Sequence, residues 1–129
     1  MFRPEKWVKS QVEPWEQQPA SAGLALKVGT AVKLDGGVLA VCNGEDKPGF
    51  ICMADVTAEK DGQMVPVERV REETVYETEL SVASASIKRG EKYTIDEGGE
   101  KLTATAGGSA EVVDFDGTKA GDKVRVRFV

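Results

Sequence analysis

A short phrase, Lys-x-Gly-x-x-[Val/Tyr]-x-[Leu/Ile/Val], occurs four times in this chain of 129 residues. Its copies begin at Lys27, Lys60, Lys88 and Lys119, so successive starts lie 33, 28 and 31 residues apart. Glycine adopts backbone conformations that other residues resist, which favours a turn. The two apolar residues that follow lie two positions apart and therefore point to one face of a strand. Four such openings predict an all-β fold, either a small β-barrel or a barrel-like sandwich of short antiparallel strands.

Alternation of apolar and polar residues places further strands along the chain. The expected strands cover residues 24–28, 31–34, 38–42, 50–56, 64–70, 74–80, 92–95, 101–105, 110–115 and a last strand near the C-terminus. In the last strand Val124, Val126 and Phe128 are expected to point inward. Pro66 has no amide donor, which predicts an edge strand or a bulge at residues 64–70. No segment makes a convincing helix.

Composition limits the classes of function. The net charge of −5, from 22 acidic and 17 basic residues, disfavours a surface for nucleic acid or an anionic membrane. The chain has no histidine, which excludes histidine-based catalytic dyads and histidine metal ligands. No apolar run is long enough to span a membrane, and the first residues do not resemble a secretory signal. We therefore expect one domain made in a cytoplasm, with no cofactor and no metal site.

Two cysteines, Cys42 and Cys52, flank a glycine-containing loop at residues 43–49. They are too few for a structural zinc site. A disulfide across a hairpin is one interpretation, which requires a location outside a reducing cell. Two reduced cysteines that pack as small hydrophobic residues on neighbouring strands are the other.

Residues 1–23 differ from the rest of the chain and are predicted to form an extended arm ahead of a single domain at residues 24–129. The arm holds three of the five prolines and both tryptophans, and it shows no helical or strand periodicity. Large aromatic residues often anchor protein interfaces. The alternative is that Trp7 or Trp15 folds back to cap an open end of the barrel.

Carboxylates are the only remaining candidates for catalysis or metal binding. Asp35 and Asp96 precede glycines in two similar hairpins and would form a catalytic dyad if the fold brought them together. Turn capping by aspartate is the alternative. The stretch at residues 114–118, Asp-Phe-Asp-Gly-Thr, superficially suggests a calcium loop. It lacks the further oxygen ligands that calcium needs, which favours a solvated turn.

The run Leu34-Asp-Gly-Gly-Val-Leu-Ala-Val-Cys42, followed by Gly49-Phe-Ile-Cys-Met-Ala-Asp-Val56, resembles the capsid decoration proteins of tailed phages. This head-stabilising or "cement" family is typified by phage lambda. Its members carry a similar strand pair followed by a segment of the type Gly-[Ile/Phe/Leu]-[Ile/Leu]-x-x-Ala-x-Val. The resemblance covers roughly residues 20–70 and rests on apolar and glycine positions.

The resemblance implies a virion structural protein without an active site. It implies clusters, commonly homotrimers, that bind the major capsid protein on the surface of an expanded shell, with the arm adding a strand to a coat subunit. Under this hypothesis the partner-binding residues are Phe2, Pro4, Trp7, Pro14, Trp15 and Pro19. The aromatic residues would anchor the arm, and the prolines would keep it extended.

Two other classes of function stay open from the residues alone. One is a carbohydrate- or small-ligand-binding β module, in which the tryptophans and the two tyrosines form a stacking platform. The other is a hydrolase that uses only the carboxylates of Asp35 and Asp96. If none of these three functions applies, the remaining expectation is a homo-oligomeric scaffold whose biological setting is unknown.

Overall fold

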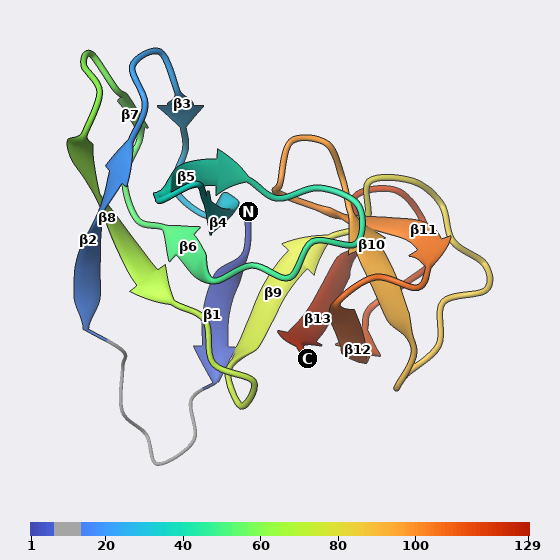
Figure 1. The fold of residues 1–129 in the computed structure, drawn as a ribbon. Helices are drawn as coiled ribbons and strands as arrows, with labels where there is room; N and C mark the ends of the chain where they lie inside the picture. Colours follow the sequence, from blue (N-terminus) through green and yellow to red (C-terminus); the bar gives the residue numbers. More distant parts are fainter. Residues whose placement is uncertain (7–13) are drawn as a thin grey trace.

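The protein is an all-β sandwich built almost entirely from antiparallel strands (Figure 1). The architecture is taken from a computed structural model, which describes residues 1–6 and 14–129. No helix occurs in these two ranges. The prediction of an all-β fold of short antiparallel strands is therefore confirmed, as a sandwich rather than a closed barrel.

One layer of the sandwich is a six-stranded sheet. Its strands, in order across the sheet, are β1 (Arg3–Lys6), β9 (Val75–Glu79), β13 (Lys123–Phe128), β12 (Ala110–Phe115), β10 (Lys92–Ile95) and β11 (Leu102–Ala106). The inner face carries the larger hydrophobic core, which includes Tyr76, Val126 and Phe128. Alternation along β13 thus places apolar residues inside and charged residues outside, as the sequence predicted for the last strand. In β9 the buried side carries Tyr76 and Thr78.

The other layer is a five-stranded sheet that curls on itself. Its order is β2 (Trp15–Ala20), β8 (Gln63–Arg69), β6 (Phe50–Cys52), β4 (Ala31–Asp35) and β5 (Val38–Val41). The edge strands β2 and β5 approach each other without pairing. The curl encloses a second apolar cluster that includes Val32, Val65 and Val67. Ile51, on the other face, packs into the core shared with the six-stranded sheet.

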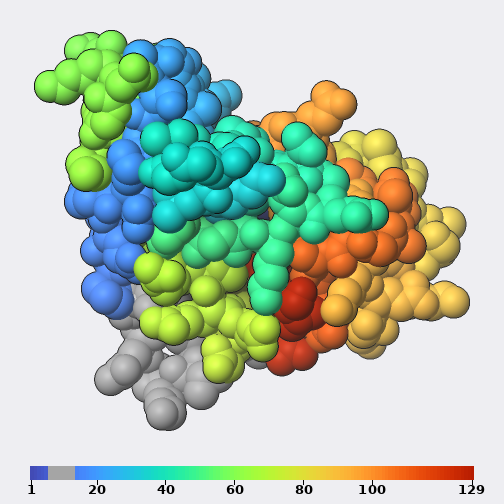
Figure 2. Space-filling view, in the orientation of Figure 1, coloured from blue at the N-terminus to red at the C-terminus, as the bar shows by residue number. Residues whose placement is uncertain are grey.

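A two-stranded ribbon, β3 (Ala25–Leu26) with β7 (Val56–Thr57), completes the fold. The two layers are joined where the β10–β11 turn meets the β4–β5 hairpin. Gly44 and Ile95 exchange two backbone hydrogen bonds, and the amide of Ala31 donates to the carbonyl of Gly99 at 2.8 Å. In the space-filling view, residues 30–50 lie between the strands at the left and the later strands at the right (Figure 2).

Each of the four repeated phrases forms a turn that leads into a strand. The glycines at positions 29, 62, 90 and 121 all have φ between 83° and 88°. The first apolar position of each phrase is fully buried, as the sequence predicted. The second is buried in three copies, but Leu34 is 44% exposed at the end of β4. The phrase therefore predicts the turn and the strand everywhere and the buried face in all copies but one.

The segment predicted as an arm belongs to the body of the protein. β1 pairs with β9, and β2 pairs with β8 over six residues. Phe2 is 1% exposed and lies in the larger core. The boundary predicted after residue 23 is not a structural division, because β1 and β2 are strands of the two sheets. The sequence did not show this, because the partners of both strands lie more than forty residues away.

Pro66 does not lie in an edge strand, which corrects the prediction from its missing amide. β8 runs between β2 and β6. The amide of Met53 donates to the carbonyl of Pro66 at 3.0 Å, just beyond the last residue of β6. In a strand, the nitrogen and carbonyl of one residue point to the same side. Pro66 is therefore tolerated because its nitrogen faces the point where the β6–β8 ladder ends.

Candidate functional site

The six residues predicted to bind a partner occupy different environments. Phe2 is buried in the core of its own chain, and Pro4 lies in β1 opposite Tyr76. Trp7 lies outside the described residues. The structure therefore assigns Phe2 a role in packing, which corrects its expected role as an exposed anchor. Partner binding stays a prediction for Pro14, Trp15 and Pro19, which lie in β2 or immediately before it.

Trp15 is the most exposed large apolar residue among those described, at 62%. It begins β2, immediately after the exposed Pro14. Pro19 follows four residues later on the same face, since side chains two and four apart along a strand share a face. Trp15 is therefore held by a strand ladder rather than by a free arm.

The opposite strand extends this exposed face. Directly paired residues of an antiparallel ladder lie on the same side of the sheet. Gln17 pairs with Pro66, and Pro19 pairs with Met64, which is 57% exposed. The exposed part of this side consists of Trp15, Gln17, Pro19, Met64 and Pro66, and is called the β2–β8 face below. Glu68, which pairs with Trp15, lies on the same side but is buried. Sequence analysis missed Met64 and Pro66, because the apolar run at residues 64–67 does not show which side is buried.

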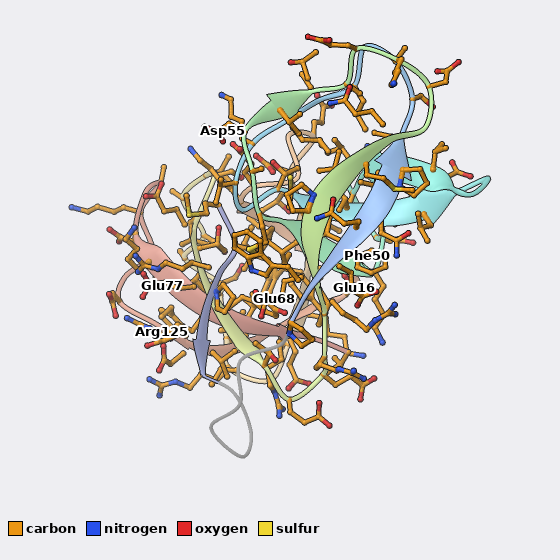
Figure 3. The ribbon with its side chains drawn as sticks, turned by 90° about the vertical axis from the view of Figure 1, so that its left-hand side faces the viewer. Glu16, Phe50, Asp55, Glu68, Glu77 and Arg125 are labelled. Atoms are coloured by element: carbon orange, nitrogen blue, oxygen red, sulfur yellow. The ribbon has the colours of Figure 1, made fainter. Side chains whose placement is uncertain are left out.

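On the reverse side of the same ribbon an ion pair links the neighbouring strands β2 and β8. Glu16 accepts two hydrogen bonds from the Arg69 guanidinium, both at 2.8 Å. The guanidinium carbon lies 5.0 Å from the centre of the Phe50 ring. The hydrogen bond to Arg69 lowers the pKa of the Glu16 carboxyl. Glu16 and Phe50 lie close together in Figure 3, away from Glu77 and Arg125.

The stretch expected as a solvated turn or calcium loop is tied to an arginine. Nη1 of Arg125 lies 2.6 Å from Asp114 and 2.8 Å from Asp116, and its Nε lies 3.6 Å from Glu77. These hydrogen bonds lower the pKa of the Asp116 carboxyl and raise the pKa of Arg125. The guanidinium occupies the position between the acids that a cation would need. This arrangement is an ordinary ion-pair network on the outer face of the six-stranded sheet.

The two aspartates considered as a catalytic dyad lie at the ends of strands, next to hairpin turns. Asp96 accepts hydrogen bonds from the backbone amides of Glu100 and Lys101, at 2.9 and 3.0 Å. Asp35 ends β4 and is exposed at the hairpin that connects to β5. The geometry of Asp96 matches turn capping.

Both cysteines are buried and free. Cys52 lies in the cluster inside the curled sheet, whereas Cys42 lies in the larger core. Burial raises the pKa of Cys42 to about 12, and burial also raises the pKa of Cys52. The structure therefore matches the interpretation of two reduced, hydrophobic cysteines rather than a disulfide.

The two tyrosines that were considered for a stacking platform are buried. Tyr76 and Tyr93 are 0% and 2% exposed, so neither can stack against a ligand at the surface. Among the described residues, no cluster of three or more His, Cys, Asp or Glu side chains is placed to hold a metal ion. No helix within the same residues could cross a membrane.

No protein-family model matches the chain, and a search of curated proteins finds no match.

Proposed function

We propose that this protein is a non-enzymatic structural protein that binds and stabilises the capsid shell of a tailed phage, as a decoration protein. The observation that supports the proposal best is the placement of Trp15. A large aromatic side chain exposed on a paired strand is pre-oriented for a protein partner, and tryptophan is enriched at the energetic centres of interfaces. The partner is the major capsid protein, and the site of action is the outer surface of the virion.

The polar groups of the described residues support the same function indirectly. Arginine, lysine or backbone partners lower the pKa values of four carboxyl groups, those of Glu16, Asp46, Glu79 and Asp116. A general acid would instead need a raised pKa. These four carboxylates are therefore held in their charged form by their partners.

Stabilisation of the shell follows from the coupling between binding of this protein and assembly of the shell. A protein that binds the expanded shell more tightly than its dissociated subunits shifts the equilibrium toward the intact shell. A homotrimer at a symmetry axis would bring three copies to neighbouring coat subunits.

The direct test is co-sedimentation with empty expanded capsid shells of the phage that encodes this chain. We expect saturable binding and a higher melting temperature of decorated shells. Shells that sediment without the protein at micromolar concentration would contradict the proposal. A change in tryptophan fluorescence on adding glycans, without shell binding, would favour the carbohydrate-binding class instead.

A further inference from the structure

Asn43 is the only asparagine of the chain, and Gly44 follows it. The side chain of Asn43 is exposed, in the loop that connects β5 to β6. Asparagine is a thermolabile residue. In an unstructured chain it loses its side-chain amide fastest when glycine follows, because glycine has no side chain to hinder the reaction. Residues 43 and 44 are therefore a chemically unstable pair wherever the backbone is free to move.

The reaction needs the backbone nitrogen of Gly44. That nitrogen loses its proton and attacks Cγ of Asn43, so that a new N–Cγ bond forms. The bond from Cγ to the side-chain nitrogen breaks, and ammonia leaves with the proton. Water then opens the five-membered succinimide ring and gives either aspartate or isoaspartate. Solvent water is the only co-reactant.

In the folded protein this nitrogen is held by a hydrogen bond. The Gly44 amide donates to the carbonyl of Ile95 at 2.9 Å, and the Ile95 amide donates back to the carbonyl of Gly44 at 3.0 Å. This bridge joins the β5–β6 loop to β10 of the other sheet (Figure 1). A hydrogen-bonded amide exchanges its proton only when the structure around it opens. The attack on Asn43 therefore requires the same opening.

Asp46 ties the loop to both sheets. Its carboxylate lies 3.0 Å from Nζ of Lys33, in β4, and accepts a hydrogen bond from the Asn43 amide at 3.2 Å. Its carbonyl accepts a hydrogen bond from Oγ of Ser109 at 2.8 Å, next to the start of β12. Removing the Ser109 hydroxyl frees one of these ties and leaves Asn43 and Gly44 unchanged.

We infer that Asn43 is a site of spontaneous deamidation that the Gly44–Ile95 bridge blocks in the folded chain. The site becomes reactive when the junction between the two sheets opens. Isoaspartate would add one carbon atom to the backbone beside the bridge, so the modified junction could not close in the same register. This inference does not depend on the proposed function.

The test follows the full-length protein at pH 8 and physiological temperature, in native buffer and in guanidinium chloride. Deamidation raises the mass of the chain by one dalton, and peptide mapping assigns the change to Asn43. Hydrogen exchange of the Gly44 amide, measured by nuclear magnetic resonance, reports the opening of the bridge. Ser109→Ala weakens the junction, and Val82→Ala, at a position that is 47% exposed, is the matched control. Asn43→Gln keeps an amide but would need a six-membered ring.

We expect Asn43 of the wild type to deamidate in guanidinium chloride, and at least about tenfold more slowly in native buffer. V82A should match the wild type, and N43Q should not gain mass at this position. S109A should deamidate faster, in step with faster exchange of the Gly44 amide. If S109A does not fold, wild type in urea below its unfolding transition supplies the faster exchange.

Three results would overturn the inference. One is an Asn43 that stays intact in guanidinium chloride, and another is an equal rate in native buffer. The third is a native rate that does not rise when the Gly44 amide exchanges faster.

Discussion

The ring of Phe2 packs edge-on against the ring of Phe128, with centroids 5.1 Å apart and an interplanar angle of 68°. The second residue of the chain therefore completes the core next to its last strand. Phe128 also contacts Tyr76 of β9, which pairs with β1. The amide of Phe2 donates to the carbonyl of Gly29 at 2.8 Å, which fixes the start of the chain between the two layers.

Replacing Phe2 with alanine should destabilise the protein by about 3–5 kcal/mol, because the change leaves a cavity at a fully buried aromatic site. Equilibrium unfolding in urea, followed by circular dichroism, measures the difference. Val82→Ala, at an exposed position, should change the free energy of unfolding by less than about 0.5 kcal/mol. A loss below about 1 kcal/mol for F2A would show that the segment is not part of the core.

Alanine substitutions at two turn glycines, Gly29 and Gly62, test whether the first residues of the chain pack against Gly29. Gly29 and Gly62 have φ of +88° and +83°, so alanine is strained by a similar amount, about 1–2 kcal/mol, at either site. A Cβ at Gly62 meets nothing within 4 Å, whereas a Cβ at Gly29 would collide with the side chain of Met1. We expect Gly29→Ala to be clearly more destabilising than Gly62→Ala in urea unfolding. Equal losses would mean that Met1 yields without cost.

The sequence predicted most of the strands because their signals are local. In β13, alternating valines and basic residues identify both the strand and its buried face. Leu34 shows the limit of such a pattern, because its exposure depends on where the curled sheet ends rather than on its neighbours in sequence. β1 shows no alternation of apolar and polar residues that would predict a strand. Its residues Arg3–Lys6 form a strand because they pair with β9.

The candidate site was predictable only in part. Trp15 stood out as a large aromatic residue in a polar segment. Its neighbours Gln17 and Pro19 alternate with Glu16 and Gln18, but a mostly polar alternation does not show which side is exposed. Met64 joins the face by pairing with Pro19, 45 residues earlier in the chain, which no local pattern contains.

The buried cysteines should be unreactive in the folded protein. The thiolate is the reactive form, and burial raises the pKa of both thiols, that of Cys42 to about 12. At pH 8 we expect no reaction with Ellman's reagent under native conditions and two thiols per chain in guanidinium chloride. Substitution of Cys42 or Cys52 by serine identifies each site. Rapid native labelling of either residue would contradict its burial.

The last prediction concerns acid stability and the network around Arg125. Arg125 lowers the pKa of Asp116 in the folded protein. A depressed carboxyl pKa contributes stability above the unfolded value of about 3.9, and that contribution is lost as the pH falls through the folded pKa. The wild type should therefore lose stability as the pH decreases below about 4. Arg125→Met should be less stable at neutral pH, and its stability should fall less steeply on acidification.

Arg125→Lys is the control for this change, because it keeps the positive charge but cannot bridge Asp114 and Asp116 with a planar guanidinium. Its pH profile should lie between those of the wild type and R125M. Urea midpoints measured from pH 2.5 to pH 7 compare the three proteins. Parallel profiles for wild type and R125M would mean that the pKa of Asp116 does not depend on Arg125. In that case the contacts of Arg125 would serve packing alone, since the long side chain also covers part of the outer face of β13.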